Sequence, residues 1–514
     1  MTDVLFVNPN NSFSSYQGLS TQYSAIEPPT WALLLAKSIQ AVGYKAKILD
    51  LNAEKLSVDE AIDRIETLLP RLICFVVYGQ NPNSGSVNMH GAMQLADALK
   101  NANVKIPICA VGSHVSALPK EVLEAERSLD FLFTNEGVYA LRNILSIDFN
   151  DNEVLKNIKG IGFRYRGEVV LTDAEKPIPH EKMDSDLPGY AWELLPYKDQ
   201  PLDMYRAHFW HAEYDHSKRS PFAAIYTSLG CTFKCDFCMI NIINRDDSDE
   251  IGVASNYAKM RFWSPEFVIN EIETLIEMGV RTLRISDEMF LLNSRYFVPL
   301  CEMLRDRGYG TILNMWAYSR IDTVKSRDHL RLLKSAGFNW LAVGIESGDK
   351  RVRTEIAKGK FDDVDIRTVV KMIEEEGIEV IANYLFGLPA DSYDSMNTTL
   401  ELGLELCTMA WNGYPVMALP GSALYKIAKE SGQIVPSTYS EYSFLGFNTR
   451  PIPTEKLESH EILSFRDNAF KKYHSHPSFI RKVRNRFGEE AVNNIREMLA
   501  VTLKRKIVEE SLDN

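Results

Sequence analysis

Apolar runs alternate with amphipathic stretches over the first 145 residues. Each run ends in turn residues, and the stretch at 29–43 places Trp31, Leu35, Ile39 and Val42 on one helical face before Gly43, a typical helix-ending residue. The strand-like runs cover residues 3–9, 45–52, 71–79, 106–112 and 130–137. Strands that alternate with helices predict a Rossmann-like, doubly wound parallel sheet with helices on both faces, so we assign residues 1–145 to this α/β domain.

The alternation stops at residue 146 and resumes after residue 220. Residues 146–220 contain a hairpin pattern at 162–172 and a Pro-rich irregular stretch, so we expect a linker with a small hairpin there. Six strand candidates then alternate with helices, at residues 223–230, 282–288, 312–319, 340–347, 379–389 and 414–420. A full TIM barrel needs eight strands, so the pattern predicts a partial (β/α)6 barrel over 221–420. Residues 421–514 are expected to be mostly helical.

Composition narrows the functional classes. A chain of 514 residues exceeds one ordinary core, and its net charge of −12 argues against non-specific binding to nucleic acid. The sequence has no apolar run long enough to span a bilayer and no secretory signal at its N-terminus, so we expect a cytoplasmic location. In a reducing compartment, clustered cysteines favour metal binding or catalysis over disulfides.

Residues 228–241, "SLGCTFKCDFCMIN", hold three of the seven cysteines, at positions 231, 235 and 238. Three thiolates can bind a metal ion or an iron–sulfur cluster. A structural zinc ion usually takes four protein ligands, and His208, His211 or His216 could supply the fourth. A four-iron cluster held by three thiolates leaves one iron open to a ligand. The other cysteines, at 74, 109, 301 and 407, are expected to be packing residues.

The spacing Cys231-x3-Cys235-x2-Cys238, with an aromatic Phe237 and a position after the first barrel strand, resembles the radical S-adenosylmethionine (SAM) superfamily. This resemblance implies that the three cysteines bind a [4Fe–4S] cluster whose free iron is chelated by SAM. It also implies one-electron cleavage of SAM to a 5′-deoxyadenosyl radical that abstracts hydrogen from a substrate.

The resemblance extends to the ends of the later barrel strands. The residues that match the family's SAM-binding positions, besides Phe237, are Ser286, Asp287 and Glu288 after the second strand, Arg320 after the third, Glu346 and Ser347 after the fourth, and Gly387 after the fifth. The family pattern implies that the carboxylates bind the SAM amino end and the ribose and methionine moieties. Arg320 suits the SAM carboxylate, because a guanidinium binds a carboxylate through two hydrogen bonds.

The first 145 residues resemble the cobalamin-binding domain that precedes the barrel in one radical SAM subgroup. Ligands of parallel sheets bind beyond the carboxyl ends of the strands, and one such end here is Tyr78-Gly79-Gln80. The expected cobalamin-lining residues are Asn8, Tyr78, Gly112, His114, Glu136 and Gly137. None of the ten histidines lies in the D-x-H-x-x-G motif that supplies a lower ligand to cobalamin. We therefore expect cobalamin without a histidine ligand.

The leading functional hypothesis is a cobalamin-dependent radical SAM enzyme that methylates an unactivated carbon or phosphorus of a small-molecule substrate through methylcobalamin. A second is a non-methylating radical SAM enzyme with the same domain order, which performs cyclisation, ring rearrangement or dehydration. A third is a metal-stabilised binding protein without catalysis. A methylthiotransferase of transfer RNA is disfavoured, because no second cysteine triad is present in residues 1–145. The leading hypothesis requires an external electron donor such as flavodoxin or ferredoxin.

Overall fold

The first third of the chain forms a seven-stranded sheet in the computed structural model, which describes residues 2–79, 82–356, 361 and 364–512. Its strands lie in the order β2-β1-β3-β4-β5-β6-β7, and β1 to β5 run parallel. The strand bounds are β1 Val4–Asn8, β2 Ala46–Asp50, β3 Leu72–Val76, β4 Ile108–Val111, β5 Phe131–Phe133, β6 Ile161–Tyr165 and β7 Glu168–Leu171. The hairpin β6–β7 is antiparallel and extends the sheet past β5.

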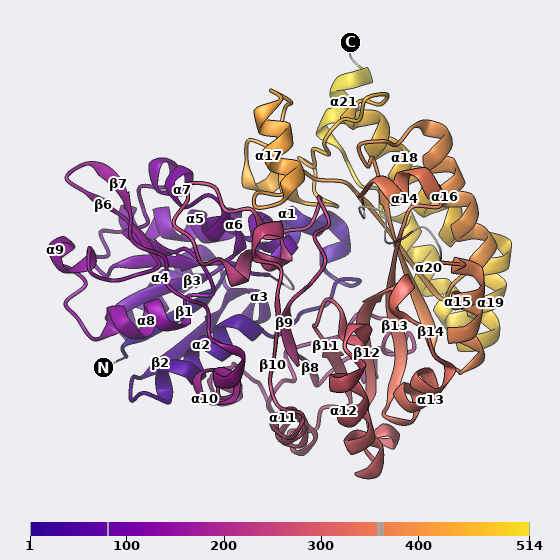
Figure 1. Cartoon of the computed structure of the whole chain (residues 1–514), viewed down its shortest axis with the longest axis horizontal. Coiled ribbons are helices and arrows are strands. Elements are labelled where there is room, and N and C mark those ends of the chain that lie inside the picture. The colour runs from indigo at the N-terminus through magenta and orange to yellow at the C-terminus, as the bar shows by residue number, and fades with distance from the viewer. Residues whose placement is uncertain (1, 80–81, 357–360, 362–363, 513–514) are drawn as a thin grey trace.

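Helices cover both faces of this sheet, as the alternation predicts (Figure 1). Buried side chains of α2 and α8 pack on one face, and those of α4, α5 and α7 pack on the other. The helix bounds are α1 Ser12–Tyr16, α2 Thr30–Gln40, α3 Leu51–Glu54, α4 Val58–Leu68, α5 Gly85–Asn101, α6 Ser113–Ala117, α7 Pro119–Ala125, α8 Val138–Leu145, α9 Asn152–Leu155 and α10 Met183–Asp186. Val42 is exposed, contrary to its helical periodicity, because α2 ends at Gln40.

The second sheet has six parallel strands in the order β15-β14-β13-β12-β11-β8. Its strands are β8 Phe222–Ile225, β11 Thr282–Ile285, β12 Asn314–Arg320, β13 Phe338–Glu346, β14 Glu379–Phe386 and β15 Ala410–Pro415. The helices that alternate with them are α11 Pro265–Glu277, α12 Ser294–Asp306, α13 Arg327–Ser335, α14 Lys350–Ile356, α15 Ile366–Glu375 and α16 Tyr393–Leu406. This curled, open sheet confirms the predicted partial barrel.

Two strand predictions differ from the structure. The run at 223–230 is two strands, because the chain leaves the barrel after β8 and residues Ser228–Gly230 form β9, which pairs antiparallel with β10 (Met260–Phe262). The sixth strand is Ala410–Pro415, and residues 416–420 of the expected run lie beyond it. Asn412 and Gly413 interrupt the apolar pattern of the true strand, so the apolar run that follows it was the stronger signal.

The C-terminal region is largely helical, with α17 Ala423–Glu430, α18 Ser459–His474, α19 Pro477–Phe487, α20 Glu489–Ala500 and α21 Lys506–Leu512. Of these helices, α18, α19 and α20 lie beside the barrel (Figure 1). Tyr473 of α18 stacks on Trp411 of β15 at 5.3 Å between ring centroids. α17 lies toward the first domain, where its Lys429 pairs with Glu121 of α7 at 2.7 Å. One apolar cluster includes side chains from both sheets, so the two α/β units share a continuous core. Among the described residues, no helix is both long enough and apolar enough to cross a membrane.

Candidate cofactor site

The cysteine loop begins directly after β9. Gly230 has φ +84°, and a Cβ there would lie 2.2 Å from the carbonyl oxygen of Lys259, so only glycine fits. The N–H of Cys231 donates to Asn241 Oδ1 at 2.8 Å, and the N–H of Phe233 donates to Cys231 Sγ at 3.4 Å. These bonds fold the loop back on itself.

The three cysteines of this loop are free, with Cys231 buried and Cys235 and Cys238 half-buried. Burial raises the pKa of Cys231 to about 12 and that of Cys235 to about 11, and it raises the pKa of Cys238 well above its usual value. The charge of Arg320 lowers the pKa of Cys231 and Cys235 and partly offsets this effect. Metal binding deprotonates thiols, so the donor set fits a group that binds thiolates strongly, such as an iron–sulfur cluster.

Two carboxylates face the cysteines. The charge of Glu288 raises the pKa of Cys231 and Cys238, and that of Glu346 raises the pKa of Cys235. Burial raises the pKa of Glu288 and of Glu346 to about 7 each. Oε1 of Glu288 is buried and has no hydrogen-bond partner among the described residues. This oxygen is available to a cationic or N–H-bearing group of a ligand.

Glu346 adopts an unusual backbone conformation at the end of β13. Its φ is +63°, and the pairing register with β14 shifts between Gly344 and Glu346. Left-handed backbone costs a non-glycine residue about 1–2 kcal/mol. Residues held in such conformations cluster at functional sites, so this strain supports a functional role for Glu346.

Asp287 and Ser286 contribute to the scaffold. Oδ1 of Asp287 accepts from the Thr227 N–H at 2.6 Å, and Oδ2 accepts from the hydroxyls of Thr227 and Ser228 at 2.6 and 2.5 Å. The backbone N–H of Ser286 donates to Ile225 O at 2.7 Å. Asp287 thus fixes the start of the cysteine loop, and of the two adjacent carboxylates it is Glu288 that faces the thiols.

Arg320 ends β12 and lies next to the cysteine loop. Its guanidinium carbon lies 3.6 Å from the ring centroid of Phe233. Its Nε and Nη2 each donate to Asp322 at 2.6 Å, and this ion pair is largely buried. Asp322 therefore orients the guanidinium and occupies one of its edges.

The remaining residues of the predicted SAM set contact other parts of the fold. The Ser347 hydroxyl is buried and contacts Thr399 Oγ1 at 3.1 Å, so it faces α16. Gly387 has φ +86°, and a Cβ there would lie 2.7 Å from Ile462 of α18. Phe237 packs against an apolar cluster that includes Leu388.

Asn8 and Tyr78 lie at the carboxyl ends of β1 and β3, the adjacent strands where the sheet order reverses. Asn8 Nδ2 donates to Asp50 Oδ1 at 2.8 Å, and the Tyr205 hydroxyl donates to Asp50 Oδ2 at 2.9 Å. The Tyr78 hydroxyl donates to Asn135 O at 3.2 Å. Ligands of doubly wound sheets bind at such a reversal. Gln80 of the predicted strand end lies outside the described residues.

The other predicted cobalamin residues have close contacts within the protein. A Cβ at Gly112 would lie 2.6 Å from the Val77 carbonyl oxygen, and one at Gly137 would lie 2.8 Å from Val111. His114 is buried with Nδ1 2.9 Å from Ser86 Oγ, and burial lowers its pKa to about 4. Glu136 Oε2 forms a buried ion pair with Arg261 Nη2 at 2.7 Å. Glu136 thus joins the first domain to β10.

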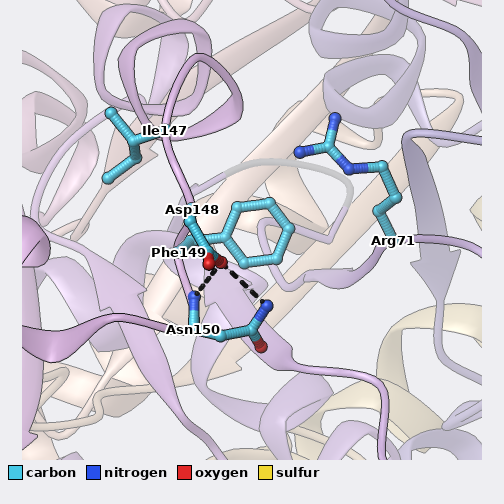
Figure 2. Close-up of a pocket in the computed structure, with 5 residues that line it drawn as sticks. All are labelled: Arg71, Ile147, Asp148, Phe149 and Asn150. Carbon is cyan, nitrogen blue, oxygen red and sulfur yellow. Dashed lines mark hydrogen bonds between the residues drawn. The ribbon is translucent and has the colours of Figure 1, made fainter.

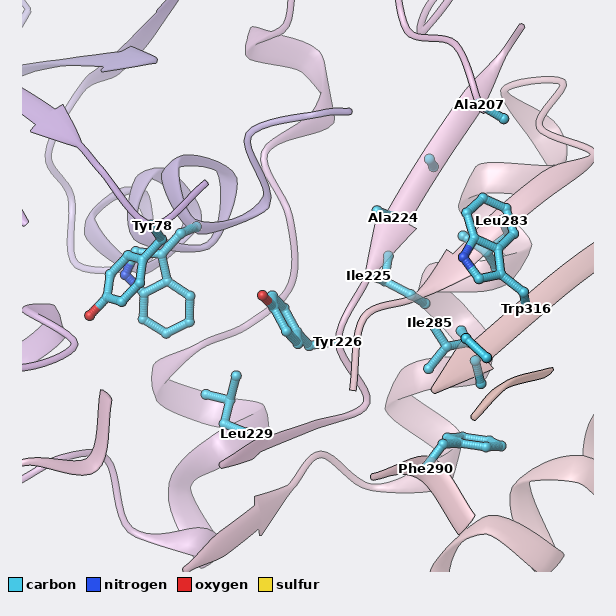
Figure 3. Close-up of a cluster of buried hydrophobic side chains, with 14 of the residues drawn as sticks. Tyr78, Ala207, Ala224, Ile225, Tyr226, Leu229, Leu283, Ile285, Phe290 and Trp316 are labelled. Carbon is cyan, nitrogen blue, oxygen red and sulfur yellow. The ribbon is translucent and has the colours of Figure 1, made fainter. Parts of the chain in front are cut away.

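The two sheets meet at a junction that the strand-end pattern alone could not place. Tyr226, which follows β8, lies between Tyr78 and the barrel residue Ile225 (Figure 3). Nearby, Arg284 of β11 forms an ion pair with Glu27, at 2.6 Å between Nη1 and Oε2, with side chains only 4% and 7% exposed. The sequence feature that could have indicated this contact is Arg284, a charged residue within the apolar strand run 282–285.

The three histidines that were considered as a fourth zinc ligand contact other parts of the protein or solvent. His211 stacks on Trp316 at 3.7 Å between centroids, in the first half of β12, whereas Arg320 at its far end lies beside the cysteine loop. His208 is half-buried and stacks on Trp210 at 4.7 Å between centroids, and His216 is exposed.

A surface pocket lies apart from this site (Figure 2). It is lined by Arg71 and residues 147–150, which follow α8. The Arg71 guanidinium lies 5.4 Å from the Phe149 ring centroid and pairs with Asp3 at 3.0 Å. Its lining contains none of the predicted cofactor residues.

Comparison with known families identifies the two domains. Residues 225–403 match the radical SAM superfamily, and residues 17–145 match the B12 binding domain. The chain therefore contains a radical SAM domain that is preceded by a B12 binding domain. The predicted family and fold class are confirmed.

Individual proteins share this organisation. The chain is 23% identical over 459 residues to an uncharacterized methyltransferase of Pyrococcus horikoshii, and the alignment covers 88% of this chain and 89% of the relative. The radical SAM methyltransferase TsrM of Kitasatospora setae, solved with cobalamin and a [4Fe–4S] cluster, has a TM-score of 0.65 at 16% identity, covering 97% of this chain and 100% of TsrM. The cobalamin-dependent radical enzyme OxsB has a TM-score of 0.63 at 14% identity, covering 97% and 72% of the two chains. The likeness to these two structures establishes the fold.

Proposed function

We propose that this protein is a cobalamin-dependent radical SAM methyltransferase that methylates an unactivated carbon or phosphorus centre of a small molecule. The observation that carries this proposal is the meeting of three free thiols with Glu288, Arg320 and Glu346 at the carboxyl ends of the barrel strands. The B12 binding domain lies directly against this centre. TsrM, solved with cobalamin and a [4Fe–4S] cluster, and the methyltransferase of P. horikoshii each align with most of this chain and support the reaction class.

In this proposal the chain supplies binding and orientation. Cys231, Cys235 and Cys238 bind a [4Fe–4S] cluster, and Glu288 accepts a hydrogen bond from the amino end of SAM. Arg320, oriented by Asp322, binds the SAM carboxylate through the edge that Asp322 leaves. When bound, the cluster and the two cofactors supply the electron, the radical and the methyl group, chemistry that no ordinary side chain provides.

The cobalamin contacts and the cellular context belong to the same proposal. Asn8 and Tyr78, at the reversal of strand order, are the residues of the predicted cobalamin set best placed to line the corrin. The net charge of −12 favours a small metabolite over nucleic acid as substrate. Free cysteines fit a reducing cytoplasm, where a flavodoxin or ferredoxin supplies the electron.

The test is anaerobic reconstitution with iron, sulfide and cobalamin, followed by incubation with SAM and dithionite. We expect 5′-deoxyadenosine, together with S-adenosylhomocysteine in an amount that follows the bound cobalamin. Cys235→Ala should abolish 5′-deoxyadenosine, whereas Cys301→Ala, in the buried core of α12, should retain it. Formation of 5′-deoxyadenosine without S-adenosylhomocysteine would favour the non-methylating alternative.

A further inference from the structure

Asn83 connects the B12 binding domain to the cysteine loop. It lies in the single 3-10 turn Pro82–Ser84, between β3 and α5. Its Nδ2 donates to Cys238 Sγ at 3.8 Å, and its Oδ1 accepts from the N–H of Met239 at 3.0 Å. One amide thus spans the two domains and contacts a cysteine sulfur directly.

The orientation of this amide follows from its partners. The N–H of Met239 can only donate, so the Asn83 oxygen must face it, and the NH2 group must then face Cys238. The turn itself is held in place, because the Ser113 hydroxyl donates to Pro82 O at 2.6 Å. A Cβ at Gly85 would lie 2.7 Å from Val77 O, so the turn packs closely against the ends of β3 and β4.

Other contacts dock the two domains without touching a cysteine. Asn135 Nδ2 donates to Arg245 O at 3.2 Å, and Glu136 pairs with Arg261 at 2.7 Å. These bonds hold the chain that continues from the cysteine loop. Asn135 is therefore a matched comparison for Asn83, since both are asparagines of the first domain that hydrogen-bond across the junction.

We propose that Asn83 is a positioning residue of the iron–sulfur site, which fixes Cys238 and donates an N–H···S hydrogen bond to its thiolate. This inference rests on the proposed function, because it assumes that Cys238 ligates the cluster. A donor to a ligand sulfur stabilises the reduced cluster, which carries one more electron, and so raises the reduction potential. The turn after β3, at the predicted cobalamin end of the first sheet, thereby influences reduction of the cluster.

The test is a redox titration of the reconstituted protein with dithionite, followed by electron paramagnetic resonance of the reduced cluster. Asn83→Asp keeps an oxygen for Met239 N–H and removes the donor to Cys238, whereas Asn83→Ala removes both bonds. At the wild-type midpoint, we expect the ratio of reduced to oxidised cluster to fall three- to tenfold in both variants; tenfold equals about 59 mV for one electron. Asn135→Ala should remain within about twofold of wild type.

The midpoint of Asn83→Ala decides the matter, because aspartate at this position also adds a negative charge that lowers the reduction potential by itself. Loss of iron from an Asn83 variant at unchanged melting temperature, with Asn135→Ala retaining iron, also supports a positioning role. Midpoints of both Asn83 variants within twofold of wild type would overturn the inference, as would an equal shift in Asn135→Ala, which would indicate general docking. A wild-type protein that takes up no iron and sulfide would instead contradict the proposed function.

Discussion

Breaking the ion pair between Arg284 and Glu27 should be costly, because both charges are buried. Arg284 Nη1 lies 2.7 and 2.6 Å from the two carboxylate oxygens of Glu27. Glu27→Gln leaves the guanidinium without a countercharge, and removing one partner of a buried pair costs about 3–5 kcal/mol. Since glutamine still offers one acceptor oxygen, we expect a loss of about 3 kcal/mol in the free energy of unfolding.

A double-mutant cycle measures this effect in urea titrations of the apoprotein followed by circular dichroism. Adding Arg284→Met to Glu27→Gln removes the stranded charge, so the double variant should be more stable than Glu27→Gln alone. The control is Glu405→Gln at the exposed Arg367–Glu405 pair, with side chains 60% and 54% exposed, which should lose at most about 1 kcal/mol. A loss below about 1 kcal/mol for Glu27→Gln, or a double variant that loses the sum of both single losses, would refute the argument.

Three further predictions concern single residues. Burial raises the pKa of Glu288 above its unfolded value, so its contribution to apoprotein stability is present below about pH 4.5 and is lost as pH rises toward 7. Glu288→Gln should therefore reduce the fall in melting temperature between pH 5 and 8. An unchanged fall would show that the titration of Glu288 does not cause it. Glu346→Gly should relieve backbone strain and raise the free energy of unfolding of the apoprotein, measured by urea titration, by about 1 kcal/mol. The same variant should bind SAM more weakly in equilibrium dialysis. A destabilised variant would show that the strain is absent. Gly112→Ala should destabilise the protein by about 1–3 kcal/mol in the same titration, because its Cβ would overlap Val77 O; unchanged stability would show that the turn can shift.

The fold was predictable wherever apolar runs and strand ends carry the information. The parallel order of both sheets follows from alternation, and the position of Arg320 and Glu288 near the cysteines follows because strand ends of a barrel share one face. Sequence could not distinguish Asp287 from Glu288, since adjacent carboxylates look alike. Only the structure shows that the Asp287 carboxylate accepts hydrogen bonds from Thr227 and Ser228 and that Glu288 faces the thiols.

The sequence did not identify the partners in contacts between distant segments. Arg284 in an apolar strand indicates a buried partner, but Glu27 lies 257 positions away, and nothing in the sequence selects it. Asn83 is one of several polar residues in a turn, and its contact with Cys238 depends on how the domains dock. For the same reason Glu136, expected near cobalamin, is paired with Arg261 across the junction.

Iron and sulfide content after anaerobic reconstitution tests the central claim most directly. The account predicts about four irons and four sulfides per wild-type chain, a loss of this content when Cys231, Cys235 or Cys238 is replaced by alanine, and its retention in Cys301→Ala. A wild-type protein that takes up neither iron nor sulfide would contradict the account. So would a variant that keeps the full iron and sulfide content after one of the three cysteines has been replaced by alanine.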